Sequence, residues 1–274
     1  MSDVPTLDII IVSYNVRDEL DACLHSLTTR TNEYSARVTV VDNGSTDGTV
    51  AMLRARWPDV DVIAHDTNVG FAAANNVGIR HGSGELVLLL NPDTIVTPHA
   101  IATLVAALGT GGHVAAAGPR LVDGHGRAEL SFGWDVNPTG ELRQKWLMAA
   151  HARHVRSAVR RIDRWSRMPG PRKWLSAACL LVRRRELEAV GLLDERYFMY
   201  YEDVDLCVAL RRRGRTVLFV PRAEVQHLRG RSASSNPDLA RRRRESQMAY
   251  YRKHNPVWAP LLRWYLRSGL RQEA

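Results

Sequence analysis

The chain has 274 residues, 45% of them hydrophobic, which is enough to bury the core of one large domain. No run of 18 apolar residues occurs, so no membrane-spanning helix is expected, and the first residues lack the charged and apolar regions of a signal peptide. The cysteines Cys23, Cys179 and Cys207 have no metal-ligand spacing, and we expect buried free thiols of a reducing compartment.

The net charge of +9 is unevenly distributed along the chain. Residues 1–142 hold 8 Lys and Arg against 17 Asp and Glu, a net charge of −9. Residues 143–274 hold 30 against 12, a net charge of +18. We therefore expect the C-terminal half to meet an anionic partner, which leaves nucleic acid, a lipid head-group layer or a diphosphate-bearing substrate.

Strand and helix patterns alternate through the first 120 residues. Aliphatic runs predict strands, and apolar residues at helical spacing predict the helices between them. The predicted strands are 7–13, 37–42, 60–65, 86–90 and 114–118, and the predicted helices are 17–29, 46–57, 70–81 and 98–108. This alternation is typical of an α/β fold in which a mostly parallel sheet is flanked by helices.

The alternation stops near residue 133. The pattern then predicts a turn-rich stretch over 133–140, a basic amphipathic helix over 141–167, an apolar run over 174–184, a helix over 202–213 and a strand over 216–220. Two strongly charged helices follow over 237–254 and 256–270. We expect a main domain over 1–236, with a basic insertion at about 141–173, and a C-terminal extension of basic amphipathic helices over 237–274.

The run from Leu86 to Leu90 reads as a strand that is buried on both faces. Pro92 cannot continue a central strand, so Asp93 is held just past the carboxyl end, where open α/β sheets place their ligands. A carboxylate at that point suits a divalent metal or a metal bound to phosphate. The alternative is an ordinary turn aspartate after a core strand.

Polar side chains also follow the first two predicted strands. Ser13 and Asn15 end the first strand, and Asp42 ends the second. The Asp42 carboxylate can accept the N3–H of a uracil or thymine ring. Ser45 or Thr46 can cap the next helix, whose N-terminus suits a phosphate. Taken alone, this segment is equally well explained as an ordinary capped turn.

Carboxylates and aromatic side chains cluster before the predicted helix in the last third of the chain. Glu202 and Asp203 can be simple helix caps, because the helix dipole favours acids there. Beside Phe198, Tyr200 and Tyr201, they can instead lie in a partly desolvated pocket that holds a carboxylate ready as a general base.

Two further segments are less specific. His227 comes just after the last predicted strand and a turn at Pro221, which keeps a metal-ligand role open. The small residues after Asn68 and Gly70 let a helix pack close to a sheet or a nucleotide, although these glycines match no dinucleotide-binding fingerprint.

Taken in order, these segments resemble the family 2 glycosyltransferases with the GT-A fold, and most of all their bacterial rhamnosyltransferase-like branch. The resemblance covers about residues 7–230, and its specificity lies in the ordered set. The matching segments are 11–15 (Ile-Val-Ser-Tyr-Asn), 41–48, 68–78, 91–93 (Asn-Pro-Asp), 174–184, 198–206 and 225–227 (Val-Gln-His).

The resemblance implies roles for individual residues. Asp42 is expected to read the base, and Asp93 and His227 to bind Mg²⁺ or Mn²⁺ with the sugar-nucleotide diphosphate. Asp203 is expected to be the catalytic base, with Glu202 beside it. The other implied contacts are Ser13, Asn15, Asn68, Gly70 and Asn91 for the nucleotide, and Trp174 and Tyr201 for the acceptor.

The implied activity is an inverting transfer of a sugar, in first place rhamnose from dTDP-rhamnose. The implied acceptor is a saccharide or a polyprenyl-diphosphate-linked intermediate of the cell envelope. One departure from the family pattern concerns the Asp-x-Asp motif, in which Asn91 replaces the first aspartate and Pro92 the middle residue. This change removes a negative charge, weakens the case for strict metal dependence and favours a dTDP-sugar.

Other functions are compatible with parts of the sequence. A UDP-sugar donor would keep the mechanism. A nucleotidyltransferase would need a Gly-rich basic loop after the first strand, where the chain has Ser13 to Arg17 instead. A non-catalytic module that binds nucleic acid or anionic lipid would leave the carboxylates near Asp203 unexplained, so no nucleic-acid partner is expected.

The C-terminal helices allow two interpretations. They can lie in the head-group layer of an anionic membrane, with Trp, Tyr and Leu facing away from most arginines. They can also pack on the main domain, with the arginines as a solvated face. The expected location is cytoplasmic, with peripheral binding to the inner face of the cytoplasmic membrane.

Overall fold

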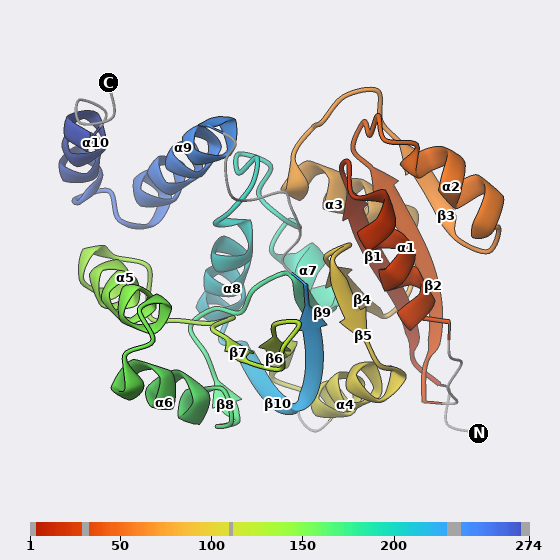
Figure 1. Cartoon of the computed structure of the whole chain (residues 1–274), viewed down its shortest axis with the longest axis horizontal. Helices are drawn as coiled ribbons and strands as arrows, with labels where there is room; N and C mark the ends of the chain where they lie inside the picture. Colours follow the sequence, from red (N-terminus) through yellow and green to blue (C-terminus); the bar gives the residue numbers. More distant parts are fainter. Residues whose placement is uncertain (1–3, 29–32, 110–111, 229–236, 270–274) are drawn as a thin grey trace.

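The computed structural model describes residues 4–28, 33–109, 112–228 and 237–269, and it shows a central sheet with helices packed against it (Figure 1). The N-terminal elements follow the predicted alternation. They are β1 (Thr6–Ser13), α1 (Arg17–Ser26), β2 (Ser35–Asp42), α2 (Thr49–Arg56), β3 (Asp61–Ala64), α3 (Phe71–His81), β4 (Leu86–Leu90), β5 (Thr94–Val96), α4 (Pro98–Gly109) and β6 (Val114–Val122).

The second half is less regular. Its elements are β7 (Ala128–Glu129), α5 (Pro138–Ala152), α6 (Arg156–Trp165), β8 (Gly170–Pro171), β9 (Cys179–Arg183), α7 (Arg184–Ala189), α8 (Glu202–Arg212), β10 (Thr216–His227), α9 (Pro237–His254) and α10 (Ala259–Gly269). Within the described residues no helix is both long and apolar enough to span a bilayer.

The sheet is mixed. Its strand order is β3-β2-β1-β4-β9-β6-β10-β5, with β7 beside β6 and β8 beside β10. The four N-terminal strands are parallel, as predicted. β9 then inserts antiparallel between β4 and β6, while β10 pairs parallel with β6, so the sheet is mostly parallel, as predicted, with β5, β7, β8 and β9 antiparallel to the rest. The predicted α/β class is confirmed.

Each face of the sheet carries its own apolar core. Residues of α1, α2 and α4 pack with alternate strand residues such as Ile9 and Leu88. Residues of α3, α7 and α8 pack with the intervening ones, such as Ile10 and Leu89. Because both faces are covered, the central strands are continuous aliphatic runs, which is why they were readable from the sequence.

Among the predicted elements, three differ from their expected bounds in ways that bear on the site. The helix predicted over 141–167 is two helices, because the chain turns between α5 and α6 at His154, whose φ is 55°. The strand predicted over 216–220 continues to His227, with a bulge between Val220 and Glu224 that accommodates Pro221. His227 is therefore the last residue of a strand, and not a residue beyond one. β6 likewise extends past 118 to Val122.

The helix α9 packs on the main domain. Lys253 Nζ and His254 Nε2 lie 2.8 and 2.5 Å from the two carboxylate oxygens of Asp205 on α8. Lys253 also donates to Asp194 over 2.7 Å. Of the two interpretations of the C-terminal helices, packing therefore applies to α9. The division at residue 237 stays a prediction.

Candidate functional site

The carboxyl ends of three neighbouring strands bring the predicted nucleotide residues to one edge of the sheet. Ser13 ends β1 and is in register with Asp42, the last residue of β2. Asn91 directly follows β4, whose Leu90 is in register with Ile11 of β1. Parallel strands place their carboxyl ends on the same edge, so these residues converge as the sequence predicts.

Two acceptors at this edge are buried without a partner. Asp42 is only 1% exposed, and its Oδ2 accepts the N–H of Ser45 over 2.9 Å. Its Oδ1, like the hydroxyl of Ser13, has no hydrogen-bond partner among the residues that the structure describes. A buried acceptor left without a donor is unfavourable, so this pair is suited to a ligand that brings an N–H or O–H group.

The loops after β1, β2 and β3 are tied to one another. The backbone N–H of Asn15, whose φ is 52°, donates to Ser45 Oγ over 2.9 Å, and Asn15 Oδ1 accepts the N–H of Thr46 over 2.8 Å. Asn43 donates to Asn68 Oδ1 over 2.9 Å and accepts the N–H of Val69 over 3.0 Å. Asn15 and Asn68 are thereby fixed around Asp42.

Gly70 brings this edge of the sheet against the segment that carries Asp203. Its φ of 93° lies in a region that glycine alone adopts readily, and a Cβ here would lie 2.6 Å from the carbonyl oxygen of Phe198. The next N–H, of Phe71, donates to that same oxygen over 2.6 Å. Any side chain at position 70 would therefore separate α3 from the segment around Phe198.

Two consecutive residues, Ala177 and Ala178, connect Asp203 to Asn91 through backbone hydrogen bonds. The backbone N–H of Ala177 donates to Asp203 Oδ2 over 3.3 Å, and the N–H of Asn91 donates to the carbonyl of Ala178 over 2.9 Å. Ala177 and Ala178 lead into β9, which pairs with β4. The antiparallel insertion of β9 is thus what places the predicted base next to the Asn91–Asp93 turn.

The two adjacent carboxylates at the start of α8 are suited to hold a proton. Burial raises the pKa of Glu202 well above its usual range, and the neighbouring Asp203 charge raises it further. Burial also raises the pKa of Asp203, although hydrogen bonds from Val204 and Ala177 oppose that rise. Glu202 Oε2 is buried without a partner. Raised carboxyl pKa values are what a general base near neutral pH requires.

Asp93 and His227 are adjacent, as the resemblance implies. His227 Nε2 lies 3.3 Å from Asp93 Oδ1, and its Nδ1 lies 3.1 Å from Glu129 Oε2 on β7. Burial alone would lower the pKa of His227, but the two carboxylates outweigh it and raise the pKa to about 9. The N–H of Leu228 also donates to the Asp93 carbonyl over 2.8 Å, which holds β10 to this turn.

This donor set fits a divalent cation that binds chiefly to a substrate. Within the described residues no three acidic, histidine or cysteine side chains are placed to hold a metal by themselves. Asp93 and His227 supply one oxygen and one nitrogen, and Mg²⁺ is commonly held by one or two protein groups plus substrate phosphates. Glu129 would orient the imidazole from behind, as carboxylates do for metal-bound histidines.

The predicted acceptor residues, Trp174 and Tyr201, both contact other parts of the protein. Trp174 donates from Nε1 to the carbonyl of Trp134 over 2.9 Å and packs against both the core and α9. The Tyr201 hydroxyl donates to Glu141 on α5 over 2.8 Å, so that hydroxyl is already engaged. Both residues lie within a few positions of Ala177 or Asp203 in sequence, and their contact with an acceptor stays a prediction.

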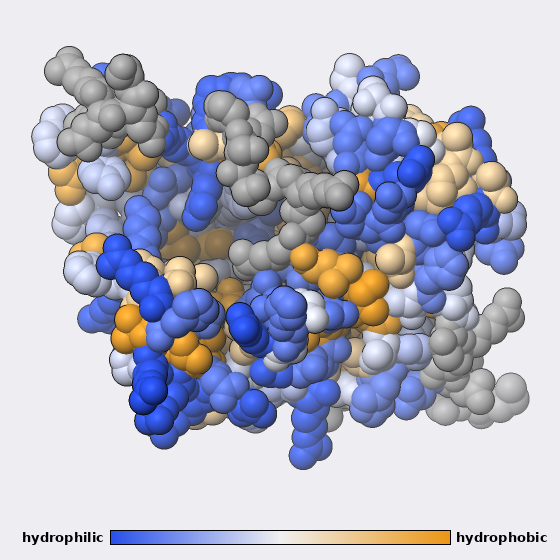
Figure 2. Space-filling view, viewed as in Figure 1, coloured by the Kyte–Doolittle hydropathy of each residue, from blue (hydrophilic) through white to orange (hydrophobic). Residues whose placement is uncertain are grey.

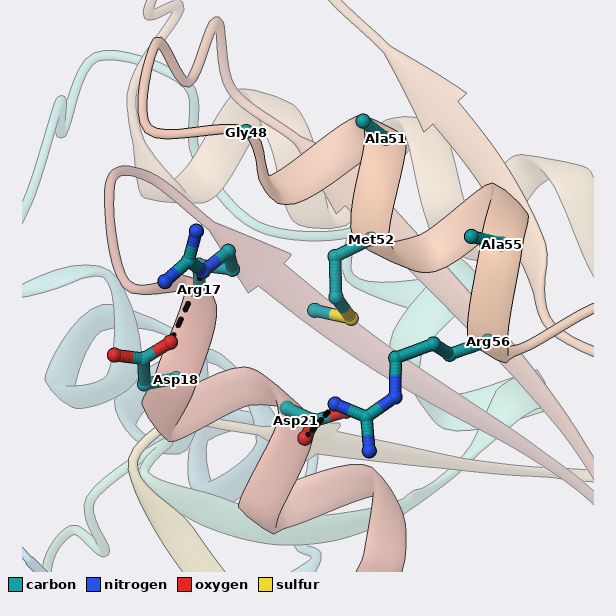
Figure 3. A pocket seen from close by; sticks show the side chains of 8 residues that line it. All are labelled: Arg17, Asp18, Asp21, Gly48, Ala51, Met52, Ala55 and Arg56. Atoms are coloured by element: carbon teal, nitrogen blue, oxygen red, sulfur yellow. Dashed lines mark hydrogen bonds and ion pairs between the residues drawn. The ribbon is translucent and has the colours of Figure 1, made fainter.

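Two surface pockets lie away from these residues. One measures about 520 Å³ between α1 and α2, and its charged side chains pair with one another, Arg17 with Asp18 and Arg56 with Asp21 (Figure 3). A smaller one of about 390 Å³ lies between α8, α9 and residues 135–137. Neither contains Asp42, Asp93 or Asp203, so neither is the candidate site.

Sequence reasoning missed Asn43, Glu129 and the Ala177–Ala178 pair. Asn43 stands inside a motif that was recognised, so its position beside Asp42 was a usable signal. Glu129 lies on a two-residue strand and gave no periodic signal. Ala177 and Ala178 act through their backbone groups, which no side-chain pattern reveals.

Comparison with known proteins adds a family to this geometry. The family model of glycosyl transferase family 2 matches residues 8–176. The N-acetylglucosaminyl-diphospho-decaprenol L-rhamnosyltransferase of Mycobacterium tuberculosis is 32% identical over 98% of this chain and 91% of its own length. A low-salt glycan biosynthesis hexosyltransferase of Haloferax volcanii is 27% identical over 75% of this chain and 62% of its own.

Solved structures show the same fold at lower identity. A mannosyltransferase of Pyrobaculum calidifontis in complex with GDP-Man and Mn²⁺ superposes with a TM-score of 0.64 at 18% identity, over 96% of this chain and 69% of its own. GalNAc-T7 with UDP, GalNAc and Mn²⁺ superposes with a TM-score of 0.64 at 18% identity. The match covers 90% of this chain and 48% of that one. These likenesses establish the fold.

Proposed function

This chain belongs to glycosyl transferase family 2 and is a glycosyltransferase, and we propose that it transfers rhamnose from dTDP-rhamnose to a lipid-linked saccharide. The observation that carries the proposal is the meeting of three groups at one sheet edge. Asp42 offers a buried free acceptor, Asp93 pairs with His227, and Asp203 reaches the Asn91 turn through Ala177 and Ala178. The rhamnosyltransferase of Mycobacterium tuberculosis supports the sugar and the acceptor.

The proposed reaction is a single displacement with inversion at the anomeric carbon. Asp203, in its deprotonated form, takes the proton of an acceptor hydroxyl while that oxygen attacks the anomeric carbon. The bond from this carbon to the diphosphate oxygen breaks, and the nucleoside diphosphate leaves with the bonding pair. Glu202 lies beside Asp203, and its raised pKa favours the protonated form of Glu202. The negative charge of the pair then lies on Asp203.

Asp93 and His227 would hold Mg²⁺ or Mn²⁺, and the bound cation would neutralise charge on the leaving diphosphate. The donor set of one carboxylate and one imidazole allows either ion, and imidazole ligation favours Mn²⁺. Asn91 carries no charge, so the protein side of this site has one anionic ligand fewer than an Asp-x-Asp motif would supply.

The nucleotide end depends on Asp42. We expect its Oδ1 to accept the N3–H of thymine or uracil, with the Ser13 hydroxyl nearby. Asp42→Ala should weaken binding of dTDP and dTDP-rhamnose roughly 10- to 100-fold, because a hydrogen bond to a charged group contributes about 1.5–3 kcal/mol. Calorimetric titration measures this, with Asp59→Ala, an exposed loop carboxylate, as the matched control.

A donor panel tests the proposal itself. Thermal shift and nucleotide release would be measured with dTDP-rhamnose, UDP-glucose, UDP-N-acetylglucosamine and GDP-mannose, each with Mn²⁺, Mg²⁺ or chelator. Selective stabilisation by dTDP-rhamnose supports the proposal. A preference for a UDP-sugar would retain the mechanism and change the donor, and no response to any sugar nucleotide would refute it.

The exposed faces of α5 and α10 are suited to bind an anionic membrane surface. Exposed apolar side chains gather on α5 and α10, with Trp146 71% and Trp264 67% exposed. Lys145 of α5 lies 5.9 Å from the Tyr265 ring of α10, so the two helices adjoin. Figure 2 shows apolar side chains among hydrophilic ones over this end of the molecule, and such surfaces bind at lipid head groups.

Neutralising two arginines of α10 tests that surface. Arg263→Gln with Arg267→Gln should lower partition onto liposomes of anionic lipid roughly 30-fold, because each basic residue near the surface contributes about 1 kcal/mol. Arg54→Gln with Arg56→Gln, on α2 at the opposite end of the molecule, is the control (Figure 1). Equal losses in both pairs, or none in either, would reject α10 as the contact.

A further inference from the structure

The segment before Asp203 has an unfavourable backbone conformation, which contacts with other elements must stabilise. Tyr200 and Tyr201 are consecutive residues with φ of 68° and 71°. Side chains with a Cβ rarely adopt this left-handed region, and two in succession are rarer. Tyr201 is the N-cap residue directly before α8, so its backbone sets the direction in which Glu202 and Asp203 enter the site.

Each of the four residues before Glu202 is contacted by another element. The carbonyl of Met199 accepts the hydroxyl of Ser246 on α9 over 2.8 Å. The guanidinium of Arg242 lies 4.1 Å from the Phe198 ring, and that of Arg243 lies 5.7 Å from the Tyr200 ring. The helix α9 therefore runs along this segment, and its Tyr250 also packs on the Tyr201 ring, with the ring centroids 5.5 Å apart.

The fourth residue, Tyr201, is held by Glu141 in the first turn of α5. One carboxylate accepts hydrogen bonds from three side chains: the Tyr201 hydroxyl at 2.8 Å, Gln247 Nε2 at 3.0 and 2.9 Å, and the Tyr251 hydroxyl at 2.9 Å. Gln247 and Tyr251 belong to α9 and lie four residues apart, on one face of the helix. Glu141 thus joins α5, α9 and the first residue before α8 at a single point.

We propose that Glu141 is a positioning residue for the catalytic base. Through Tyr201 it fixes the left-handed turn that aims Asp203, and through Gln247 and Tyr251 it makes α9 part of the catalytic domain. This inference rests on the proposed role of Asp203. It also separates the two C-terminal helices: α9 serves the chemistry, while the exposed face of α10 is free to meet a surface.

The substitution Glu141→Gln keeps the shape and replaces one acceptor oxygen with an NH₂ donor, which faces hydroxyl and amide donors. We expect kcat to fall about 10- to 100-fold, because small displacements of a catalytic group have effects of this size. The Kd for the donor should stay within twofold, since Asp42 and Asp93 do not contact Glu141. The matched control is Asp238→Asn, an exposed carboxylate on α9 that pairs with Arg241.

A second variant and a second readout keep the inference open to refutation. Tyr201→Phe removes one hydroxyl and should lower kcat in the same direction, and adding it to Glu141→Gln should cause little further loss, as expected for two members of one contact. Hydrogen exchange should increase over residues 197–206 and stay unchanged over β1 and β4.

Three results would overturn the inference. The first is a folded Glu141→Gln variant with kcat within twofold of the wild type. The second is a parallel loss of donor affinity and of exchange protection throughout the sheet, which would mean general destabilisation. The third is full additivity of the two substitutions. If the wild-type protein transfers no sugar, the proposed function fails, whereas the exchange comparison still decides whether Glu141 holds this segment.

Discussion

Asp203→Asn should leave a folded protein that binds the donor and transfers almost no sugar. The asparagine keeps the size of the side chain and can still accept the Ala177 N–H, but it cannot take a proton from the acceptor hydroxyl. Positioned general bases contribute about 10²- to 10⁴-fold to rate, so kcat should fall by that factor. Steady-state transfer and calorimetric donor binding, measured on the same preparation, separate the two effects.

The same substitution should also raise stability relative to the wild type as the pH rises. The folded-state pKa of Asp203 is raised, so in the wild type its contribution to stability is full below the unfolded pKa of about 3.9 and is lost as pH rises through the folded pKa. Asparagine has no such loss. The Tm of the variant relative to the wild type should therefore increase from pH 4 to pH 8.

Glu202→Gln is the matched control for the base. It removes the neighbouring carboxylate and leaves Asp203 unchanged, so it should alter the pH dependence of kcat. The maximal kcat should fall less than in Asp203→Asn. If Asp203→Asn retained turnover while Glu202→Gln abolished it, the base would be Glu202. Full activity in both variants would remove the pair from the mechanism.

Asp93→Asn should abolish most metal-dependent turnover. Asp93 is the one carboxylate of its turn, since Asn91 is neutral, and it also neutralises His227 at 3.3 Å. Losing a group that stabilises charge on the leaving diphosphate lowers kcat about 10²- to 10³-fold. The measurement is turnover against Mn²⁺ concentration, and both the maximum and the apparent affinity for the ion should fall.

Glu129→Gln is compared with Asp93→Asn to test the metal site, because it should weaken metal binding without removing a ligand. Glu129 contacts His227 Nδ1 and is placed to act through the imidazole, so its loss should lower metal affinity about 10- to 100-fold without removing a ligand. Equal turnover of the wild type and Asp93→Asn, with and without chelator, would show that charge on the diphosphate is neutralised by other residues.

The convergence of residues at the ends of β1, β2 and β4 was predictable because it depends on local order. Each strand ends where its aliphatic run ends, and parallel strands share one edge, so Ser13, Asp42 and Asn91 could be placed together from the sequence. For Asp203 the residue pattern left a helix cap and a general base open, and for His227 a structural histidine and a metal ligand. The family resemblance favoured the second role for each.

The remaining parts depend on contacts between distant segments. Nothing in the apolar run over 174–184 shows that β9 enters antiparallel between β4 and β6, yet this pairing brings Ala177 to Asp203. The charge of α9 suggested a membrane or a solvated face, whereas its Ser246, Gln247 and Tyr251 face the domain. Such contacts join residues up to 110 positions apart, and periodicity carries no record of them.

The most direct test of the account is a transfer assay with dTDP-rhamnose and a polyprenyl-diphosphate-linked N-acetylglucosamine, followed by NMR of the released glycan. We expect a rhamnosyl product whose anomeric configuration is opposite to that of the donor, and its loss in Asp203→Asn. No rhamnosyl product under conditions in which the enzyme transfers another sugar, or a product with the donor's own configuration, would contradict it.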